Sequence, residues 1–114
     1  AMADTRPSRL EAANKYLHLT EDRIFHSAEE IFAQPRLADI MVIATQDAQH
    51  KEHAIRAMEI GYDLLLEKPI SNNLADVVEI ANKAKELDRT VIVCHVLRYT
   101  PFYRQVKRLL TRQN

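Results

Sequence analysis

IMVIATQDAQHKEHAIRAMEIGYDLLLEKP, residues 40–69, contains two apolar runs separated by a stretch with helical periodicity. The first run, Ile40–Ala44, is unbroken and largely β-branched, which is typical of a strand buried on both faces. Apolar residues then recur at helical spacing, at Ala54, Ile55 and Met58. Gly61 follows at a position where glycine commonly ends a helix. Leu64–Leu66 is the second apolar run, so the stretch predicts a strand, a helix and another strand.

The same alternation extends towards the amino terminus. Pro7 is a residue favoured in the first turn of a helix, and apolar residues follow at helical spacing, at Leu10, Ala13 and Leu17. A short strand is expected at Ile24-Phe25. Ser27-Ala28-Glu29-Glu30 matches a capping box, in which the serine and the second glutamate satisfy free N–H groups at a helix start. A short helix is therefore expected after Ser27.

Towards the carboxyl terminus the pattern continues with a helix, a strand and a helix. Ser71 or Asn72 is expected to cap the first helix, whose apolar stripe is Leu74, Val77, Val78 and Ala81. Val91–Cys94 is a third continuous apolar run and predicts a strand. The final helix is expected to begin at Pro101 and to carry an apolar face of Phe102, Val106, Leu109 and Leu110.

Strands that alternate with helices predict an α/β fold, a Rossmann-like parallel sheet with flanking helices. Right-handed crossovers place the carboxyl ends of the strands on one rim, where open α/β sheets bind ligands. Polar residues follow the expected strands at that rim: Asp4, Thr45, Glu67, Lys68 and the His95–Arg98 segment. A generic sheet does not require so many polar positions at one edge, so a ligand site is expected there.

The composition narrows the kind of protein. Sixteen basic residues balance sixteen acidic ones, which indicates neither a nucleic-acid partner nor an anionic membrane. No apolar run approaches the roughly 20 residues that a membrane-spanning helix needs. The single cysteine, Cys94, excludes an internal disulfide and fits a reducing compartment, so a cytoplasmic location is expected. The five histidines lack tight ligand spacing, and no metal site is expected.

Glu67-Lys68-Pro69 is the sharpest chemical signal in the chain. The leucine strand delivers an acid and a base to the rim, and Pro69 prevents the strand from continuing. A lysine held there can donate a proton to a carbonyl or hydroxyl oxygen, or anchor it. The alternative is a surface ion pair at a strand end, and the residues alone leave both open.

Several motifs together resemble one family. Ala44-Thr45 at a strand end is followed by His50, Gly61 and then Leu66-Glu67-Lys68-Pro69-Ile70, and Arg98-Tyr99-Thr100-Pro101 follows the last strand. This arrangement resembles the Gfo/Idh/MocA oxidoreductases, a family named for glucose–fructose oxidoreductase and inositol dehydrogenase. The resemblance covers essentially the whole chain. It implies a Rossmann-like domain that binds a nicotinamide dinucleotide.

The resemblance also implies roles for individual residues. Lys68 would lie beside the nicotinamide and assist substrate binding or proton transfer, and Glu67 would lie near the nicotinamide ribose. The Thr45–His50 loop would line the path of the cofactor across the sheet, although a histidine at a helix start, as His50 is, is often structural. Arg98 would approach the cofactor from the last strand.

Asp4 bears on the choice between NAD and NADP. An acid at the end of the second strand of such a domain accepts hydrogen bonds from the adenosine ribose hydroxyls and repels a 2′-phosphate. NAD is therefore favoured, although Arg6 lies near enough in sequence to accommodate a phosphate.

Relative to the family pattern, parts of the enzyme are not among these residues. Gly61 is the only glycine, so the chain holds no glycine-rich pyrophosphate loop. We therefore expect residues 1–114 to be a partial dinucleotide-binding domain, without the first strand, loop and helix and without the substrate domain. In the strand order 3-2-1-4-5-6 the absent strand is the central one, so an exposed edge beside Ile40–Ala44 and self-association or a homo-oligomer are expected.

Three functions remain open from the sequence. The first is part of an NAD(P)-dependent oxidoreductase acting on a sugar, polyol or related small alcohol, with this chain alone inactive. The second is a non-catalytic regulatory or interaction module on a dehydrogenase scaffold. The third is a receiver-like signalling domain, which would need a phosphorylatable aspartate after its middle strand, where this chain has His26.

Overall fold

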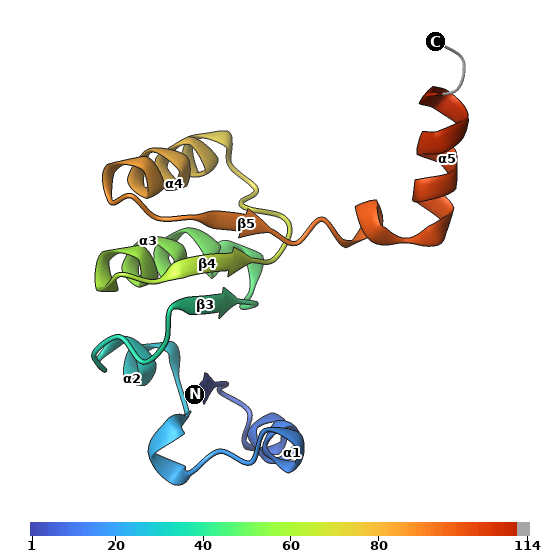
Figure 1. Cartoon of the computed structure of the whole chain (residues 1–114). Helices are drawn as coiled ribbons and strands as arrows, with labels where there is room; N and C mark the ends of the chain where they lie inside the picture. The colour runs from blue at the N-terminus through green and yellow to red at the C-terminus, as the bar shows by residue number, and fades with distance from the viewer. Residues whose placement is uncertain (112–114) are drawn as a thin grey trace.

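The structure is a computed structural model that describes residues 1–111, in which strands and helices alternate along the chain (Figure 1). The strands are β1 (Met2–Ala3), β2 (Ile24–Phe25), β3 (Ile40–Ile43), β4 (Asp63–Leu66) and β5 (Val91–Val93). The helices are α1 (Pro7–Leu17), α2 (Ala28–Phe32), α3 (His50–Ile60), α4 (Leu74–Glu86) and α5 (Pro101–Thr111). Three 3₁₀ turns, η1 (Glu21–Arg23), η2 (Asp47–Gln49) and η3 (Val96–Tyr99), lie between them.

Local side-chain chemistry explains where the helices begin. Ser27 Oγ accepts a hydrogen bond of 3.1 Å from the backbone N–H of Glu30 at the start of α2, as the capping box predicts. The Glu30 carboxylate in turn accepts one of 2.7 Å from His26 N–H. The prediction for α4 was wrong by one or two residues, because Asn73 caps it by accepting from Ala75 N–H at 2.9 Å. Ser71 instead accepts from Asn73 N–H and donates to Asp76, which steadies the loop before the cap.

The strands are all parallel but form two separate sheets. β1 pairs with β2, and β3, β4 and β5 pair in that order. The register aligns Ile43 with Leu66 and Leu66 with Val93, so the three strands of the larger sheet end level with one another. The predicted Rossmann-like α/β architecture is confirmed, and no strand joins β1 to β3 within residues 1–111.

The core lies between the larger sheet and the pair α3 and α4, which cover the same face (Figure 1). Its most buried members come from both layers: Ala54, Ala57, Met58 and Ile80 from the helices, and Ile43, Leu64 and Leu66 from the strands. The expectation that Ile40–Ala44 is buried on both faces was wrong. Ile40 and Val42 are each 61% exposed, and Ile92 of β5 is 60% exposed, because no helix among the described residues covers their face.

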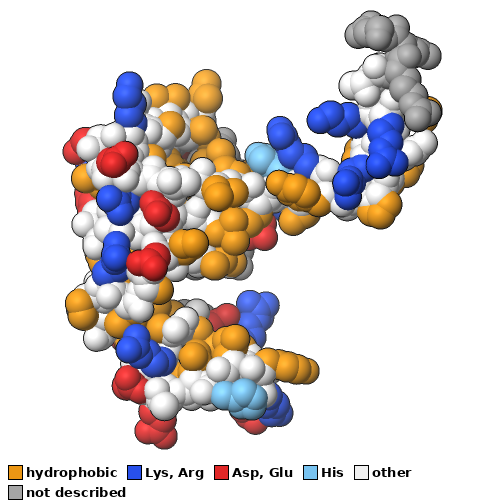
Figure 2. Space-filling view, in the orientation of Figure 1, with side chains coloured by type: hydrophobic (Ala, Val, Ile, Leu, Met, Phe, Trp, Pro, Cys, Tyr) orange, Lys and Arg blue, Asp and Glu red, His pale blue; other side chains and the backbone are white. Residues whose placement is uncertain are grey.

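The chain is more extended than a compact domain of its length. Its radius of gyration is 16.9 Å, against about 13 Å expected for a globular chain of this size. A hollow separates the β1–β2 unit from the larger sheet (Figure 2). α5 projects away from the larger sheet (Figure 1). The apolar face predicted for α5 is therefore not buried among residues 1–111: Phe102 is 69% exposed and Leu110 is 68% exposed.

Gly61 ends α3 in a conformation that favours glycine. Its φ of 106° lies in the left-handed region, and its N–H donates to the carbonyl groups of Ala57 and Met58. A Cβ atom there would meet Arg36 at an ordinary 3.6 Å, so the cost of a side chain is in the backbone.

We expect Gly61→Ala to lower the free energy of unfolding by about 1–2 kcal/mol, because an L residue with positive φ is strained. Asp88 follows α4 with a φ of 52° and supplies the matched control. Asp88→Gly relieves a similar backbone conformation but makes the unfolded chain more flexible, so it should change the same free energy by less than about 1 kcal/mol. Urea unfolding followed by circular dichroism measures both. Equal losses in the two variants would show that backbone conformation is not the cause.

Candidate functional site

The level ends of β3, β4 and β5 build the candidate site. Two hydrogen bonds continue the parallel pairing past the last strand residues: Glu67 N–H donates to Ile43 C=O, and Cys94 N–H donates to Leu66 C=O, each at 2.9 Å. Thr45, Glu67 and His95 therefore leave adjacent strands at one edge. This is the carboxyl rim at which open parallel sheets bind ligands.

Lys68 presents its side chain at the end of β4. It is exposed, and the peptide bond that joins it to Pro69 is cis. Glu67 is half-buried, and its Oε2 accepts a hydrogen bond of 3.1 Å from the backbone N–H of Lys68. Among the ion pairs of residues 1–111, none includes Lys68. The alternative of a surface ion pair between the two side chains is therefore not what the geometry shows.

Thr45, at the end of β3, is held by two histidines of α3. Its carbonyl oxygen lies 3.2 Å from His50 Nε2, and its Oγ1 lies 3.0 Å from His53 Nδ1. Both rings are buried, His50 being 1% and His53 4% exposed. His50 also reaches the carbonyl oxygen of Pro69 through Nδ1, at 2.7 Å. The sequence-predicted residues Thr45 and His50 thus lie together, and His50 links them to the Glu67–Pro69 turn.

Burial sets the protonation of His53. Loss of water contact lowers the pKa of this ring from its ordinary 6.5, and the Glu52 and Glu29 carboxylates oppose the shift only in part. A neutral ring has one nitrogen free to accept, so Thr45 Oγ1 can donate to His53 Nδ1. Phe32 packs against the ring at 5.5 Å between centroids, which helps to keep water away.

We expect the chain to lose stability as the pH falls below about 6.5. The unfolded His53 takes up a proton first, because its folded pKa is the lower of the two, so the stabilisation present at neutral pH is lost on acidification. His53→Asn removes the titration and keeps an oxygen near Nδ1 for Thr45. Thermal unfolding at a series of pH values should show a smaller acid loss in this variant than in the parent. Parallel pH profiles would mean that His53 does not contribute.

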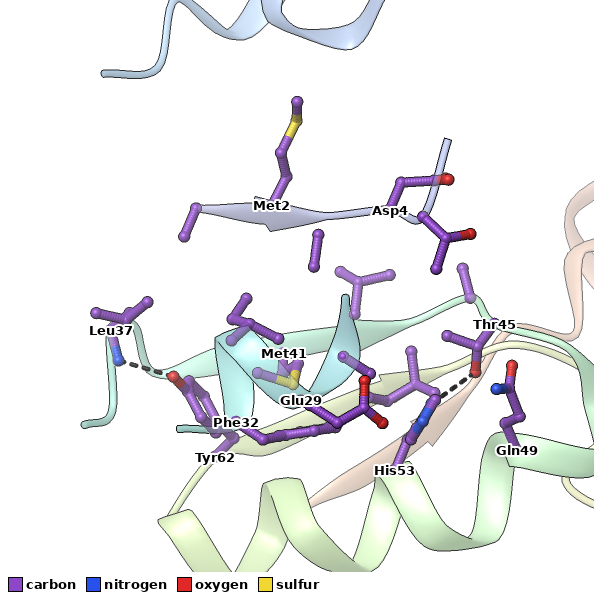
Figure 3. A pocket seen from close by; sticks show the side chains of 18 of the residues that line it. Met2, Asp4, Glu29, Phe32, Leu37, Met41, Thr45, Gln49, His53 and Tyr62 are labelled. Atoms are coloured by element: carbon purple, nitrogen blue, oxygen red, sulfur yellow. Dashed lines mark hydrogen bonds between the residues drawn. The ribbon is translucent and has the colours of Figure 1, made fainter. Parts of the chain in front are cut away.

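A cavity of about 520 Å³ lies between the two sheets, in the hollow beside β3. Asp4 lies on the wall formed by β1, and Thr45, Gln49 and His53 lie on the opposite wall, toward the same end (Figure 3). The Asp4 carboxylate accepts a hydrogen bond of 2.8 Å from Arg6 N–H and lies 3.6 Å from the Arg9 guanidinium. The cavity thus brings Asp4 and Thr45 together, and Glu67, Lys68, His50 and Arg98 do not line it.

Arg98 lies apart from the other predicted site residues. It belongs to η3, after β5, and is exposed beside Arg104 and Lys107 of α5. Basic side chains gather over this projecting arm in Figure 2.

Sequence reasoning missed His53 and Tyr62, which line the cavity together with Gln49 of the predicted Thr45–His50 loop. Tyr62 is 2% exposed, and its hydroxyl accepts a hydrogen bond of 2.8 Å from Leu37 N–H. A signal for His53 was present, because His50, His53, Ala54 and Ala57 recur at helical spacing on the buried face of α3.

The donor chemistry fits part of a dinucleotide. Carboxylate, hydroxyl and ammonium groups at the rim suit ribose hydroxyls and a reacting oxygen, whereas the chain's single glycine, Gly61, ends a helix at the opposite edge of the sheet. No three His, Cys, Asp or Glu side chains within residues 1–111 cluster as a metal site. None of the helices described has the length and apolar character needed to cross a bilayer.

Known proteins resemble this chain in both sequence and fold. The family model for the Gfo/Idh/MocA oxidoreductases, described as an oxidoreductase family with an NAD-binding Rossmann fold, matches residues 1–95. Dehydrogenase aclE of Aspergillus oryzae is 29% identical over 110 residues, which make up 96% of this chain and 30% of that protein.

Solved structures that share the fold include two with a bound nicotinamide cofactor. The WlbA dehydrogenase from Bordetella pertussis, in complex with NADH and UDP-GlcNAcA, is 26% identical with a TM-score of 0.81, over 96% of this chain and 33% of that one. Scyllo-inositol dehydrogenase from Lactobacillus casei, with bound NAD(H) and scyllo-inositol, has a TM-score of 0.81 at 20% identity, over 96% of this chain and 32% of that one. The chain therefore spans about a third of the length of these proteins.

Proposed function

Because this chain belongs to the Gfo/Idh/MocA family of NAD-binding oxidoreductases, we propose that it forms the nicotinamide side of a dehydrogenase. The reaction moves hydride between a nicotinamide dinucleotide and a sugar, polyol or related small alcohol. The observation that carries the proposal is Lys68, whose exposed side chain stands at the carboxyl rim without an ion-pair partner among residues 1–111. The sugar-like ligands of the structural neighbours support the substrate class.

Each rim residue has a role that its chemistry allows. The cofactor, when bound, would supply the hydride acceptor. Lys68 Nζ takes a proton from the reacting hydroxyl, or gives one to the carbonyl oxygen in the reverse reaction. Glu67, with one carboxylate oxygen held by Lys68 N–H, offers the other to a ribose hydroxyl of the nicotinamide half. Thr45 borders the path of the cofactor from the cavity to the rim, and Arg98 approaches from the arm after β5.

Asp4 favours NAD over NADP in this proposal. Its carboxylate already accepts from Arg6 N–H and lies beside Arg9. Its side chain is 29% exposed, and the residue lines the cavity. The remaining lone pairs can accept from the two adenosine ribose hydroxyls, and the negative charge repels a 2′-phosphate. The chain's single glycine ends a helix, so these residues hold no glycine-rich pyrophosphate loop, and the 114 residues alone are proposed to be inactive.

The proposed function is tested with the protein that carries this chain. It is incubated with NAD⁺ or NADP⁺ and a panel of sugars and polyols, while NADH absorbance is recorded, and cofactor binding is measured by calorimetry. Turnover with at least one substrate, and tighter binding of NAD⁺ than of NADP⁺, are expected. Cofactor binding without turnover across the panel would favour the non-catalytic module. Tight NAD⁺ binding by the 114 residues alone would contradict their proposed incompleteness.

We also propose that the open face of the larger sheet, formed by Ile40, Val42 and Ile92, drives self-association of the chain. These side chains are each about three-fifths exposed, and next to them β3 has an edge that pairs with no strand of residues 1–111. Sedimentation of the 114-residue chain should give a mass that rises with concentration, and Val42→Lys should shift it towards the monomer. A monomer at every concentration would contradict this, and Val78→Lys on the outer side of α4 is the control.

A further inference from the structure

His50 is the most buried polar residue of the site, and the proposed chemistry does not use it. Its side chain is 1% exposed, so it cannot reach a ligand without a rearrangement of α3. Both ring nitrogens face backbone carbonyl oxygens: Nδ1 lies 2.7 Å from Pro69 O, and Nε2 lies 3.2 Å from Thr45 O. The ring therefore connects the ends of β3 and β4 and has no nitrogen left over for a cofactor.

The two contacts are not equivalent. A neutral imidazole carries one N–H and can donate to one carbonyl oxygen only, whereas a ring with both protons donates to both. The contact at 2.7 Å is the shorter one and requires a proton on Nδ1. Without that proton, the lone pair of Nδ1 and a lone pair of the Pro69 carbonyl oxygen would repel each other at this distance. In either protonation state, His50 Nδ1–H is thus the donor to Pro69.

The turn that His50 contacts has few other anchors. Before Lys68, Glu67 N–H is bound to Ile43 C=O, and Lys68 N–H is bound only to the adjacent Glu67 carboxylate. Pro69 has no N–H. On the carboxyl side of Lys68, Ile70 packs against the core through apolar contacts, which are non-directional. Within residues 1–111, the His50 contact is the one hydrogen bond that ties the Lys68–Ile70 segment to another element.

The element that carries His50 is itself firmly held. Lys51, the next residue, bridges α3 to α4 through Asp76 at 3.0 Å and Glu79 at 2.7 Å. One turn further along, Ala54 and Ala57 are fully buried against the sheet and α4. A hydrogen bond from the start of this firmly held helix to Pro69 C=O therefore fixes the Lys68–Ile70 turn relative to α3.

We propose that His50 is a positioning residue, which donates Nδ1–H to the carbonyl group of Pro69 and thereby fixes the turn that presents Lys68 to the reacting oxygen. The role rests on the proposed function of Lys68, and His50 itself touches neither cofactor nor substrate. It replaces the direct cofactor contact that the sequence suggested for this residue. A small shift of Lys68 is sufficient to lower the rate, since displacement of a catalytic group by about 1 Å can cost roughly 10²-fold.

Three substitutions at one position separate positioning from other roles. Asparagine places its amide nitrogen where Nδ1 lies, glutamine places it nearer to Nε2, and leucine offers no donor. His50→Leu and His50→Gln are expected to lower kcat by about 10²-fold, and His50→Asn by less than about tenfold. The dissociation constant of NAD⁺ should stay unchanged in all three. Weaker NAD⁺ binding in the Asn and Gln variants alike would show a direct cofactor contact and overturn the proposal.

A second readout does not depend on turnover. In uniformly ¹⁵N-labelled protein, NMR should show that His50 Nδ1 carries a proton. The amide signals of Lys68 and Ile70 should move in His50→Gln but not in His50→Asn. A ring protonated only on Nε2, or equal amide changes in the two variants, would refute the positioning role. If a variant fails to fold, the position of the proton on the His50 ring of the unaltered protein still tests the positioning role. Absence of turnover in the unaltered protein would instead count against the proposed function.

Discussion

Lys68→Met is expected to lower kcat of the dehydrogenase reaction by about 10²–10⁴-fold, the usual contribution of a positioned acid or base. Methionine keeps the length of the side chain and removes the ammonium group. Lys68 is exposed at the rim and has no ion-pair partner among the described residues, so its loss should leave the core intact. Steady-state kinetics with NAD⁺ and the best substrate of the panel measure the effect, with thermal unfolding as the check on folding.

Two further variants sharpen this test. Lys68→Arg keeps the positive charge, but a guanidinium does not release its proton near neutral pH, so proton transfer should remain lost. Recovery of kcat in this variant would show that Lys68 only anchors the substrate by charge. Lys85→Met, in the exposed part of α4, is the matched control and should retain full activity. A Lys68→Met enzyme with the kcat of the control would remove Lys68 from the mechanism.

Leu66→Ala is expected to lower the free energy of unfolding by about 2–5 kcal/mol, the range for a buried leucine truncated to alanine. Leu66 is fully buried where β4 meets α3 and α4, and its neighbours cannot close the space completely. Such a loss is a large share of the roughly 5–15 kcal/mol that stabilises a typical domain. Urea unfolding followed by circular dichroism gives the difference between the parent and the variant.

Leu74→Ala supplies the same substitution at an exposed site. Leu74 begins α4 and is 78% exposed, so the expectation that it belongs to the apolar stripe facing the core was wrong; Ile80 is the buried residue of α4. Truncation of Leu74 should therefore cost less than about 0.5 kcal/mol. Comparable losses at Leu66 and Leu74 would show that the core assigned between the larger sheet and the two helices is wrong.

The elements of the fold were largely predictable from sequence because their signals are local. Pro7 begins α1, Ser27 caps α2, and Gly61 ends α3, each through backbone geometry or a hydrogen bond within a few residues. The apolar runs of β3 and β4 likewise marked adjacent parallel strands. Membership in the oxidoreductase family, suggested by the same residues, is confirmed and excludes the receiver-like alternative.

Burial was harder to predict because it depends on distant elements. The run Ile40–Ala44 is apolar throughout, yet Ile40 and Val42 are exposed, since α3 and α4 cover one face of the sheet only. The same holds for α5, whose helical periodicity was correct but whose apolar face contacts none of the layers described. An apolar pattern shows which side chains would gain from burial. It does not identify which other element, if any, covers them.

The rim that carries the candidate site could be predicted from sequence, but the contacts at that rim could not. Strand ends placed Thr45 and Lys68 at one rim, which the register of β3 and β4 bears out. Two contacts are visible only in the structure. Both ring nitrogens of His50 lie within hydrogen-bond distance of backbone carbonyl oxygens, and His53 Nδ1 contacts the hydroxyl of Thr45. Both contacts join residues through the packing of α3 on the sheet, which no spacing rule encodes.

The central claim, that these residues form the nicotinamide side of a hydride-transfer site, is tested most directly by following the hydride. The protein that carries this chain is incubated with NAD⁺ and a polyol deuterated at its carbinol carbons, and the recovered NADH is examined by NMR. We predict deuterium at C4 of the nicotinamide ring and almost none when Lys68→Met replaces the parent protein. Failure to form any deuterated NADH with the parent protein across the substrate panel would contradict the claim.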